Sequence, residues 1–373
     1  MATILSIVPY KIFPAKVGGQ KGIALFNRYF AKEIGLVSVS VKSNDPVYAE
    51  GYTMLNVLAD APTRYINPLN VFVIKKIIKQ YGATHLLLEH PYYGWLGILL
   101  KWMTGVKLVI HSHNIESLRW KTLGKWWWPV LWQYEKFTHR MANYNFFIQD
   151  ADRQLAIEGF RLSPEKCVTV TYGIEWNAAP SRQEREKCRQ WLQQQHDIGN
   201  NRCILLFNGT LNYKPNLDAL HIILEKINPL LLLSGLEYTI IICGRDLPDS
   251  LNGLEAYSGK NVVYAGFTED ISIYFKGADI FINPVVDGGG IKTKLVEAIG
   301  YGTRAVSTEN GSIGVSKEDA GDLLHITSNA GWQEFVTVII HASQSPAPAV
   351  PVSFFEKFYW GNIAKKAAAF IQR

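Results

Sequence analysis

The residues best suited to chemistry lie in one stretch, Asn283–Gly302, where a glycine-rich loop precedes a helix-like pattern. The apolar run Ala278–Ile282 predicts a buried strand, and Asp287–Gly290 predict a tight loop with almost no side chains. From Ile291 the apolar residues recur at helical spacing. A strand, a glycine loop and a helix start leave the first N–H groups of the helix without internal partners, which favours an anion-binding site.

Two lysines, Lys292 and Lys294, fall in the first turn of this predicted helix, on either side of Thr293. A positive side chain at the positive end of a helix dipole costs a few tenths of a kcal/mol to about 1 kcal/mol. The pair is easier to explain if a negative ligand offsets it. The alternative interpretation is an ordinary strand-to-helix turn of a parallel sheet.

A second stretch with chemical potential, His111-Ser112-His113-Asn114-Ile115-Glu116, follows the predicted strand 107–111. Two histidines and a glutamate could indicate a metal. However, we expect His111 and His113, two residues apart at the end of a strand, to point to opposite sides. With no third ligand cluster in the sequence, we predict no metal and interpret His113 as a single histidine that donates or accepts a hydrogen bond.

The elements that must position these residues alternate between strands and helices, which predicts α/β domains with parallel sheets. In such sheets ligands bind beyond the carboxyl ends of the strands. The length of 373 residues suits two domains. We predict a first domain over 1–175, a linker helix over 176–202, a second domain over 203–350 and a long final helix over 353–373.

Charge and aromatic residues concentrate in the first domain. Up to Glu175 the chain carries 20 Lys and Arg against 12 Asp and Glu, and seven of the 11 tryptophans, three of them adjacent at Trp126–Trp128. Adjacent helical residues differ by about 100°, so these three cannot all face one core. An anionic membrane surface would suit such a domain, with packing between two helices as the alternative for the tryptophans. No nucleic-acid-binding motif accompanies the basic charge, so we expect no nucleic acid partner.

The four cysteines, Cys167, Cys188, Cys203 and Cys243, show no metal-binding or paired spacing, which fits a reducing compartment. No leader-like pattern and no apolar run of about 20 residues occur, so we expect a cytoplasmic protein. The pair Gly18-Gly19 precedes a predicted helix over 21–34. It is either a simple helix start or a place where a ligand touches the backbone.

The arrangement resembles the GT-B glycosyltransferases, and in particular the retaining family-4 group. The resemblance is carried by F-N-G-T-L-N-Y-K-P-N-L-D-A-L at 207–220, G-F-T-E-D-I at 266–271, A-D-I-F-I-N-P at 278–284, G-G-G-I-K-T-K-L-V-E-A-I-G-Y-G at 288–302 and F-Y-W at 358–360. Weaker similarity covers Val17–Gly19 and His113–Glu116. The resemblance as a whole implies two Rossmann-like domains facing a cleft, with the C-terminal helix crossing back to the N-terminal domain.

The resemblance also implies roles for individual residues. Glu297 would bind the ribose of a nucleotide sugar, the N–H groups of Lys292 and Thr293 would hold its diphosphate, and His113 would lie near the transferred sugar. The residues implied at the donor are Gly18, Gly19, Gly209, Thr210, Lys214, Phe267, Thr268, Asp287, Gly289, Gly290, Ile291, Lys292 and Thr293; those at the acceptor are Asn114 and Glu116; the catalytic residues are His113, Lys294 and Glu297.

The sequence departs from the family pattern in two places. The first Glu of the family's Glu-x7-Glu motif falls at Gly289, with Asp287 as the nearest substitute. The usual Arg and Lys after the first strand of the second domain fall at Thr210 and Asn216. The positive charge that Arg and Lys supply in the family must therefore come from Lys292, Lys294 or Lys214. Lys294 is the best candidate because it shares a helical face with Glu297.

The function implied is a retaining, metal-independent glycosyltransferase. It would move a sugar from a UDP- or GDP-linked donor to a glycan or lipid-linked acceptor in bacterial polysaccharide or glycolipid synthesis, at the inner face of the membrane and without any cofactor. Two alternatives remain: a non-catalytic GT-B scaffold that binds a nucleotide or glycan, favoured by the two departures, and an epimerase that acts on UDP-sugars.

Overall fold

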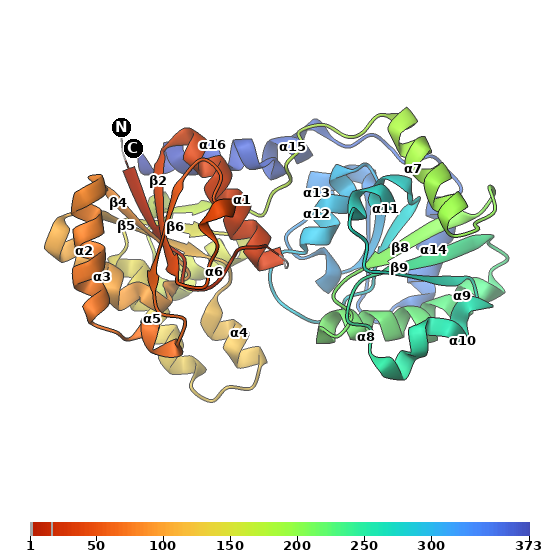
Figure 1. The fold of residues 1–373 in the computed structure, drawn as a ribbon. Helices are drawn as coiled ribbons and strands as arrows, with labels where there is room; N and C mark the ends of the chain where they lie inside the picture. Colours follow the sequence, from red (N-terminus) through yellow and green to blue (C-terminus); the bar gives the residue numbers. More distant parts are fainter. Residues whose placement is uncertain (1–2, 16–17) are drawn as a thin grey trace. The chain divides into compact units, whose positions relative to one another are not determined.

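The computed structural model describes residues 3–15 and 18–373, so Val17, part of one predicted donor loop, lies outside the described residues. The chain forms two compact units. Unit 1 comprises Met1–Glu175 together with Phe358–Arg373, and unit 2 comprises Trp176–Lys357. Each is built on one parallel sheet with helices on both faces, which confirms the predicted α/β class (Figure 1).

Unit 1 contains a seven-stranded sheet in the order β3-β2-β1-β4-β5-β6-β7. The strand order reverses between β1 and β4, which is where ligands bind in open α/β sheets. The elements are β1 (Thr3–Ile7), α1 (Gly18–Glu33), β2 (Gly35–Val41), β3 (Thr53–Leu58), α2 (Leu69–Tyr81), β4 (His85–Glu89), α3 (Gly94–Thr104), β5 (Lys107–Ser112), α4 (Glu116–Thr122), α5 (Trp128–Met141), β6 (Tyr144–Phe147), α6 (Asp150–Phe160), β7 (Cys167–Thr169) and α16 (Trp360–Ile371).

Both faces of the unit 1 sheet are covered, which is why its central strands are apolar throughout. All five residues of β4 are buried, as are the last five of β5. Helices α2 and α3 pack on one face of the sheet, and α1 and α16 lie side by side on the other (Figure 1). Glu89, the last residue of β4, is therefore held in the interior of unit 1.

Unit 2 contains a six-stranded sheet in the order β10-β9-β8-β11-β12-β13, with the reversal between β8 and β11. Its elements are α7 (Arg182–Gln195), β8 (Cys203–Asn208), α8 (Lys214–Ile222), a π-helical turn (Ile223–Ile227), α9 (Asn228–Leu233), β9 (Tyr238–Cys243), α10 (Glu255–Ser258), β10 (Val262–Gly266), α11 (Ile271–Gly277), β11 (Ile280–Asn283), α12 (Thr293–Gly300), β12 (Arg304–Thr308), α13 (Lys317–Ala320), β13 (Leu324–Thr327), α14 (Trp332–Ser343) and α15 (Val352–Phe358), the last of which ends at the first residue of the returning segment.

The segment predicted as a linker is an integral part of unit 2. Helix α7 packs on α11. Arg185 of α7 donates to the carbonyl oxygens of Lys276 and Ala278 at 3.1 and 3.2 Å. These bonds attach α7 to unit 2, because buried carbonyl groups need a donor. No local pattern indicates these bonds, because the segment is mostly polar and charged.

The predicted final helix is interrupted at Tyr359, where the backbone is extended between α15 and α16. Ile174 donates to the carbonyl oxygen of Phe358 at 2.7 Å, and Trp360 donates back to Ile174 at 3.0 Å. This short parallel bridge takes the place of helical hydrogen bonds. Helix α16 then buries Trp360 and Ile363 in unit 1, as the predicted return of the chain requires.

The segment that follows β5 contains two separate helices, α4 and α5. Gly124, between them, has a φ of 68°, which ends the helical run. The three tryptophans follow this glycine and differ in exposure: Trp126 is 85% exposed, whereas Trp127 and Trp128 are half-buried. No helix within the described residues is long and apolar enough to cross a bilayer.

Candidate functional site

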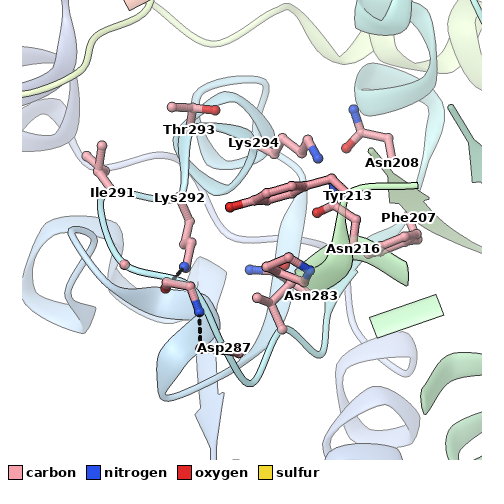
Figure 2. A pocket seen from close by; sticks show the side chains of 14 residues that line it. Phe207, Asn208, Tyr213, Asn216, Asn283, Asp287, Ile291, Lys292, Thr293 and Lys294 are labelled. Atoms are coloured by element: carbon pink, nitrogen blue, oxygen red, sulfur yellow. Dashed lines mark hydrogen bonds between the residues drawn. The ribbon is translucent and has the colours of Figure 1, made fainter. Parts of the chain in front are cut away.

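Unit 2 contains a cavity of about 170 Å³ at the carboxyl ends of β8 and β11, where the strand order of its sheet reverses. Figure 2 shows the side chains that surround it. The wall comprises Phe207, Asn208, Tyr213, Pro215, Asn216, Asn283, Val285, Asp287, Gly288, Gly289, Ile291, Lys292, Thr293 and Lys294. The predicted glycine loop and helix start therefore line one cavity together.

Two helices begin at this cavity. Tyr213, Pro215 and Asn216 belong to the start of α8, and Thr293 and Lys294 to the start of α12. Each helix N-terminus carries roughly half a positive charge. The convergence of two such termini favours an anion in the cavity.

The backbone donors of α12 differ from those expected. The N–H of Lys292 already donates to the carbonyl oxygen of Ile313 at 3.1 Å, so its predicted role in holding a diphosphate is wrong for this N–H. The N–H groups of Thr293 and Lys294 are the first two of the helix and have no acceptor within the described residues. These two donors can serve an anion.

Lys294 supplies the cation of the cavity. Its ammonium makes no hydrogen bond and no ion pair to any residue that the structure describes. Burial lowers the pKa of Lys294 to about 8, while the charge of Glu297, one turn further along α12, acts in the opposite direction. A Cβ on residue 209 would lie only 2.9 Å from the Lys294 ammonium. Glycine at this position therefore leaves room for the ammonium.

Lys292 has a different function, because its ammonium donates to the carbonyl oxygen of Gly288 at 2.5 Å. The same loop is fixed by the N–H of Gly288, which donates to Asp287 at 2.6 Å. Burial lowers the pKa of Lys292 to about 8, and the charge of Asp287 raises it in part. Lys292 therefore holds the glycine loop, with Lys294 left available for a ligand.

Several residues implied at the donor lie outside the cavity wall. Lys214 is exposed and forms an ion pair with Asp218 at 2.5 Å, so its charge is already partly offset. Thr210 contributes a carbonyl oxygen that accepts from Asn216 at 2.9 Å. Phe267 is 70% exposed beside Gly266. Thr268, Gly290 and the half-buried Glu297 are likewise not part of the wall.

Five polar or aromatic residues of the wall were not predicted: Phe207, Asn208, Tyr213, Asn216 and Asn283. The side-chain oxygen of Asn208 is buried without a partner in the part of the chain that the structure describes. Figure 2 shows Asn208, Tyr213 and Asn216 on the side of the cavity that Lys294 approaches. A simple rule would have found Asn208 and Asn283, since each is the last residue of a strand at the reversal point.

Unit 1 has its own cluster of polar side chains at the ends of β4 and β5. Glu89 Oε2 lies 2.7 Å from His113 Nε2 and 3.0 Å from His111 Nδ1. The expectation that the two histidines point to opposite sides is therefore wrong, because residues two apart on an extended chain lie on the same side and His113 directly follows β5. The two rings are 4.5 Å apart.

A second carboxylate joins this cluster. Glu116 lies 3.4 Å from His90 Nδ1 and accepts from Tyr92 Oη at 2.6 Å and from Arg119 at 3.2 Å. Burial alone would raise the pKa of Glu116, but His90, Tyr92 and Arg119 together lower it to about 2. Glu116, predicted at the acceptor, is thus an ionised and fully buried member of the network.

Glu89, His111 and His113 are of the right types for a divalent ion, with ligand atoms within 4.8 Å of one another. A tetrahedral ion about 2.0–2.1 Å from each ligand would hold them roughly 3.3 Å apart. The 2.7 Å between His113 and Glu89 is instead a direct hydrogen-bond distance. The geometry thus favours hydrogen bonding in this cluster, and the absence of a metal stays a prediction.

The lowered pKa values of Lys292 and Lys294 predict that the protein takes up protons when a nucleoside diphosphate binds at pH 8. Part of each lysine is neutral at that pH in the free protein. An adjacent dianion raises both pKa values, so affinity should fall as the pH rises above about 8. Calorimetry in two buffers of different ionisation enthalpy, with UDP and GDP, measures the uptake.

The matched control for this experiment is the double variant Lys292→Met, Lys294→Met, which should bind without taking up protons. The same shifts affect stability. The unfolded chain keeps these protons up to the ordinary pKa of 10.5, so the unfavourable contribution of both lysines is complete below pH 8 and disappears as the pH approaches 10.5. If the unmodified protein binds the nucleotide at pH 8 without taking up protons, the pKa values of Lys292 and Lys294 are not lowered as described.

Comparison with known proteins agrees with this architecture. Residues 39–176 match the family model described as Glycosyltransferase Family 4, and residues 202–344 match Glycosyl transferases group 1. A curated relative from Klebsiella pneumoniae, "Uncharacterized 44.6 kDa protein in cps region", is 28% identical over 128 residues, which span 33% of this chain and 33% of that protein.

Two solved structures are similar over the whole chain. Anabaena Alr3699/HepE, determined in complex with UDP, has a TM-score of 0.73 at 13% identity and covers 99% of both chains. The lipopolysaccharide outer core galactosyltransferase WaaB, in its apo form, has a TM-score of 0.67 at 12% identity and covers 100% of both. At these identities the likeness concerns the fold.

Two Rossmann-like units in one chain, each with the 3-2-1-4-5-6 strand order at its centre, define the GT-B class. The chain belongs to the GT-B glycosyltransferases, and its two halves carry the domains that the family 4 and group 1 models describe.

Proposed function

We propose that this protein is a retaining glycosyltransferase that transfers a sugar from a UDP- or GDP-linked donor to a glycan or a lipid-linked acceptor. The observation that carries the proposal is the cavity of unit 2, where two helix N-termini converge with the ammonium of Lys294, which has no hydrogen-bond or ion-pair partner among residues 3–15 and 18–373. The complex of HepE with UDP supports a nucleotide donor. The names of WaaB and of the cps-region relative support a role in bacterial polysaccharide or glycolipid assembly.

In the proposed reaction the bond between the anomeric carbon and the phosphate oxygen breaks, and the acceptor oxygen bonds to the same face of that carbon. The acceptor proton passes to the leaving diphosphate, which departs as a nucleoside diphosphate. Lys294 and the N–H groups of Thr293 and Lys294 stabilise the charge that develops on the diphosphate. Glu297 binds the ribose, and His113 contacts the transferred sugar.

The test has two stages. A thermal-shift screen of UDP, GDP and their sugar conjugates identifies the donor, since a ligand at 100 times its Kd adds about 2.7 kcal/mol of apparent stability. NMR of the glycoside formed with that donor then shows the anomeric configuration. Net inversion would refute the retaining mechanism. Undiminished transfer in the presence of EDTA is expected if the reaction needs no metal.

A non-catalytic scaffold is the alternative favoured by Gly289, Thr210 and Asn216, which stand where the family has Glu, Arg and Lys. A scaffold would bind the nucleotide but neither transfer nor slowly hydrolyse its sugar. The less favoured epimerase would convert the donor sugar without any acceptor. Product analysis of a donor-only reaction separates the three functions.

We also propose that the protein acts at the cytoplasmic face of the membrane and binds anionic lipid through unit 1. Helices α2 and α3, which pack against each other, expose an apolar patch. Both helices carry lysines and neither carries an acidic residue, so the patch is complementary to an anionic surface. The patch comprises Leu69, Phe72, Val73, Leu99, Trp102 and Met103, and Trp126 is a separate exposed tryptophan of the same unit.

The double variant Phe72→Ser, Trp102→Ser is expected to reduce binding to anionic vesicles by about tenfold or more, because both side chains are 66% exposed and would be buried in lipid. Co-sedimentation at low salt measures this binding. Trp126→Ser reports separately on the loop between α4 and α5. Leu233→Ser, an exposed apolar residue of unit 2, is the matched control. If the unmodified protein does not bind vesicles at low salt, the membrane proposal fails.

A further inference from the structure

The cluster at the ends of β4 and β5 determines which nitrogen of His113 carries a proton. Glu89 Oε2 is the shared partner of His111 and His113, at 3.0 and 2.7 Å, and the carboxylate is wholly buried. Although burial alone would raise the pKa of Glu89, the two imidazoles hold it well below its usual range. An ionised carboxylate can only accept hydrogen bonds, so the proton of neutral His113 must be on Nε2.

The other ring nitrogen, Nδ1, then presents a lone pair. It has no hydrogen-bond partner in the part of the chain that the structure describes, while the His113 side chain is 10% exposed. The residue lies at the carboxyl edge of the sheet, next to the reversal between β1 and β4, where such sheets bind ligands. Nδ1 is therefore available to accept a hydrogen bond from a ligand hydroxyl.

His90 supplies an independent observation. Its backbone has φ 73° and ψ 152°, a region that is essentially restricted to glycine. Such strain persists only where the surrounding structure enforces it, and it concentrates at functional sites. Here it holds the His90 ring stacked on His113, with centroids 4.4 Å apart and 23° between the planes.

The His90 ring is held by a hydrogen bond at one nitrogen and lies near a carboxylate at the other. Nε2 lies 3.1 Å from Tyr10 Oη, and Nδ1 lies 3.4 Å from Glu116 Oε1. Tyr10 follows β1 and His90 follows β4, so this contact joins the two strands on either side of the reversal. His113 is thus held by a hydrogen bond at its edge and by a stacked ring on its face.

We propose that Glu89 and His90 are positioning residues that fix His113 in the Nε2–H tautomer, with Nδ1 directed at a hydroxyl of the transferred sugar. This inference rests on the proposed glycosyltransferase function. It adds a requirement that nothing in the family resemblance supplies: a buried carboxylate from β4 must accept from the histidine that follows β5. Neither positioning residue touches the sugar.

The tautomer can be measured on the full chain without any activity assay. Long-range ¹H–¹⁵N correlation spectra of protein labelled at histidine report which ring nitrogen is protonated, and comparison with His113→Asn assigns His113 among the nine histidines. The expected result at neutral pH is Nε2–H. An Nδ1–H tautomer in the unmodified protein would overturn the proposal, and this holds even if every variant of Glu89 fails to fold.

Two variants of Glu89 separate hydrogen bonding from packing. In Glu89→Gln the amide oxygen can still accept from the imidazoles, so the Nε2–H tautomer should persist and kcat should change less than threefold. In Glu89→Leu the acceptor is lost, so both tautomers should be populated and kcat should fall roughly tenfold, with the donor KM little changed. An unchanged tautomer in Glu89→Leu would contradict the inference.

His90→Gly tests the stacked ring. Glycine accepts the backbone conformation of His90 without strain, which offsets part of the loss of the buried ring, and thermal unfolding checks that the variant is folded. Loss of the ring should nevertheless lower kcat severalfold, and undiminished kcat would remove His90 from the proposal. If the unmodified protein has the expected tautomer but transfers no sugar, the proposed function fails while the placement of the proton stands. If transfer occurs with the other tautomer, only the positioning inference fails.

Discussion

Lys294→Met is expected to lower kcat/KM by about 100- to 1,000-fold, the usual effect of removing one preorganised donor that faces developing charge. The substitution should leave the protein folded and at least as stable. Lys294 is half-buried, and its ammonium makes no hydrogen bond or ion pair to any described residue, so it destabilises the protein without ligand. A methionine has nearly the same length and carries no charge to desolvate.

The measurements are initial rates with the donor identified by the binding screen, and thermal unfolding with and without the nucleotide. Lys226→Met, on an exposed position of the π-helical turn, is the matched control and should change neither quantity. Near-normal turnover in Lys294→Met would show that another cation stabilises the diphosphate. A large loss of stability would show that the ammonium has a structural partner.

Gly244→Ala should disrupt the cavity through the backbone. A Cβ on Gly244, which follows β9, would overlap the carbonyl oxygen of Gly209. That carbonyl belongs to the loop that leads to Tyr213 and Asn216 in the cavity wall. Because backbone cannot move aside cheaply, we expect a loss of about 2–4 kcal/mol of unfolding free energy and at least tenfold weaker nucleotide binding.

Gly235→Ala is the control for this prediction. Gly235 also has a positive φ, 75°, and precedes the same strand, but no atom lies within 4 Å of the Cβ that alanine would add. It should cost only about 1 kcal/mol, the penalty of the left-handed conformation, and leave nucleotide affinity unchanged. Equal effects of the two substitutions would mean that strain, and not the contact with Gly209, is responsible.

Most of the fold could be predicted because its elements follow local rules. The strands predicted over 107–111 and 278–282 correspond to β5 and β11 to within two residues at each end, since each is an apolar run between turn residues. Helix α2 likewise ends by a local rule, at Gly82, with that glycine in the left-handed conformation. The interruptions at Gly124 and Tyr359 were not predicted, because the residues on both sides continue the helical spacing.

The cavity of unit 2 could be predicted in part for a similar reason. A glycine loop and a helix start are contiguous in sequence, so their proximity needs no knowledge of the sheet. Tyr213 and Asn216 come from a different crossing of the sheet and enter the wall only because β8 and β11 are neighbours. The hydrogen bond that occupies the Lys292 N–H comes from Ile313, which follows β12, and no local pattern indicates it.

The unit 1 cluster depends even more on the order of the strands. Glu89 and His90 are at the end of β4, and His111 and His113 at the end of β5, about 20 residues further along the chain. The two strands pair directly, with Glu89 opposite His111. The expectation that no third side chain accompanies the histidines was wrong because the partner lies on the neighbouring strand and not in the same stretch of sequence.

The return of the chain to unit 1 has a consequence for biosynthesis. Helix α16 packs against α1 and buries Phe370 near Tyr144 and Phe146, with ring centroids 5.7 and 6.3 Å apart. The ribosome makes all of unit 2 before it makes this helix, so the first unit to be started is the last to be finished. Unit 2 is one continuous segment and can complete its sheet during synthesis. Until α16 emerges, the apolar side chains that it covers on unit 1 stay exposed to chaperones and proteases.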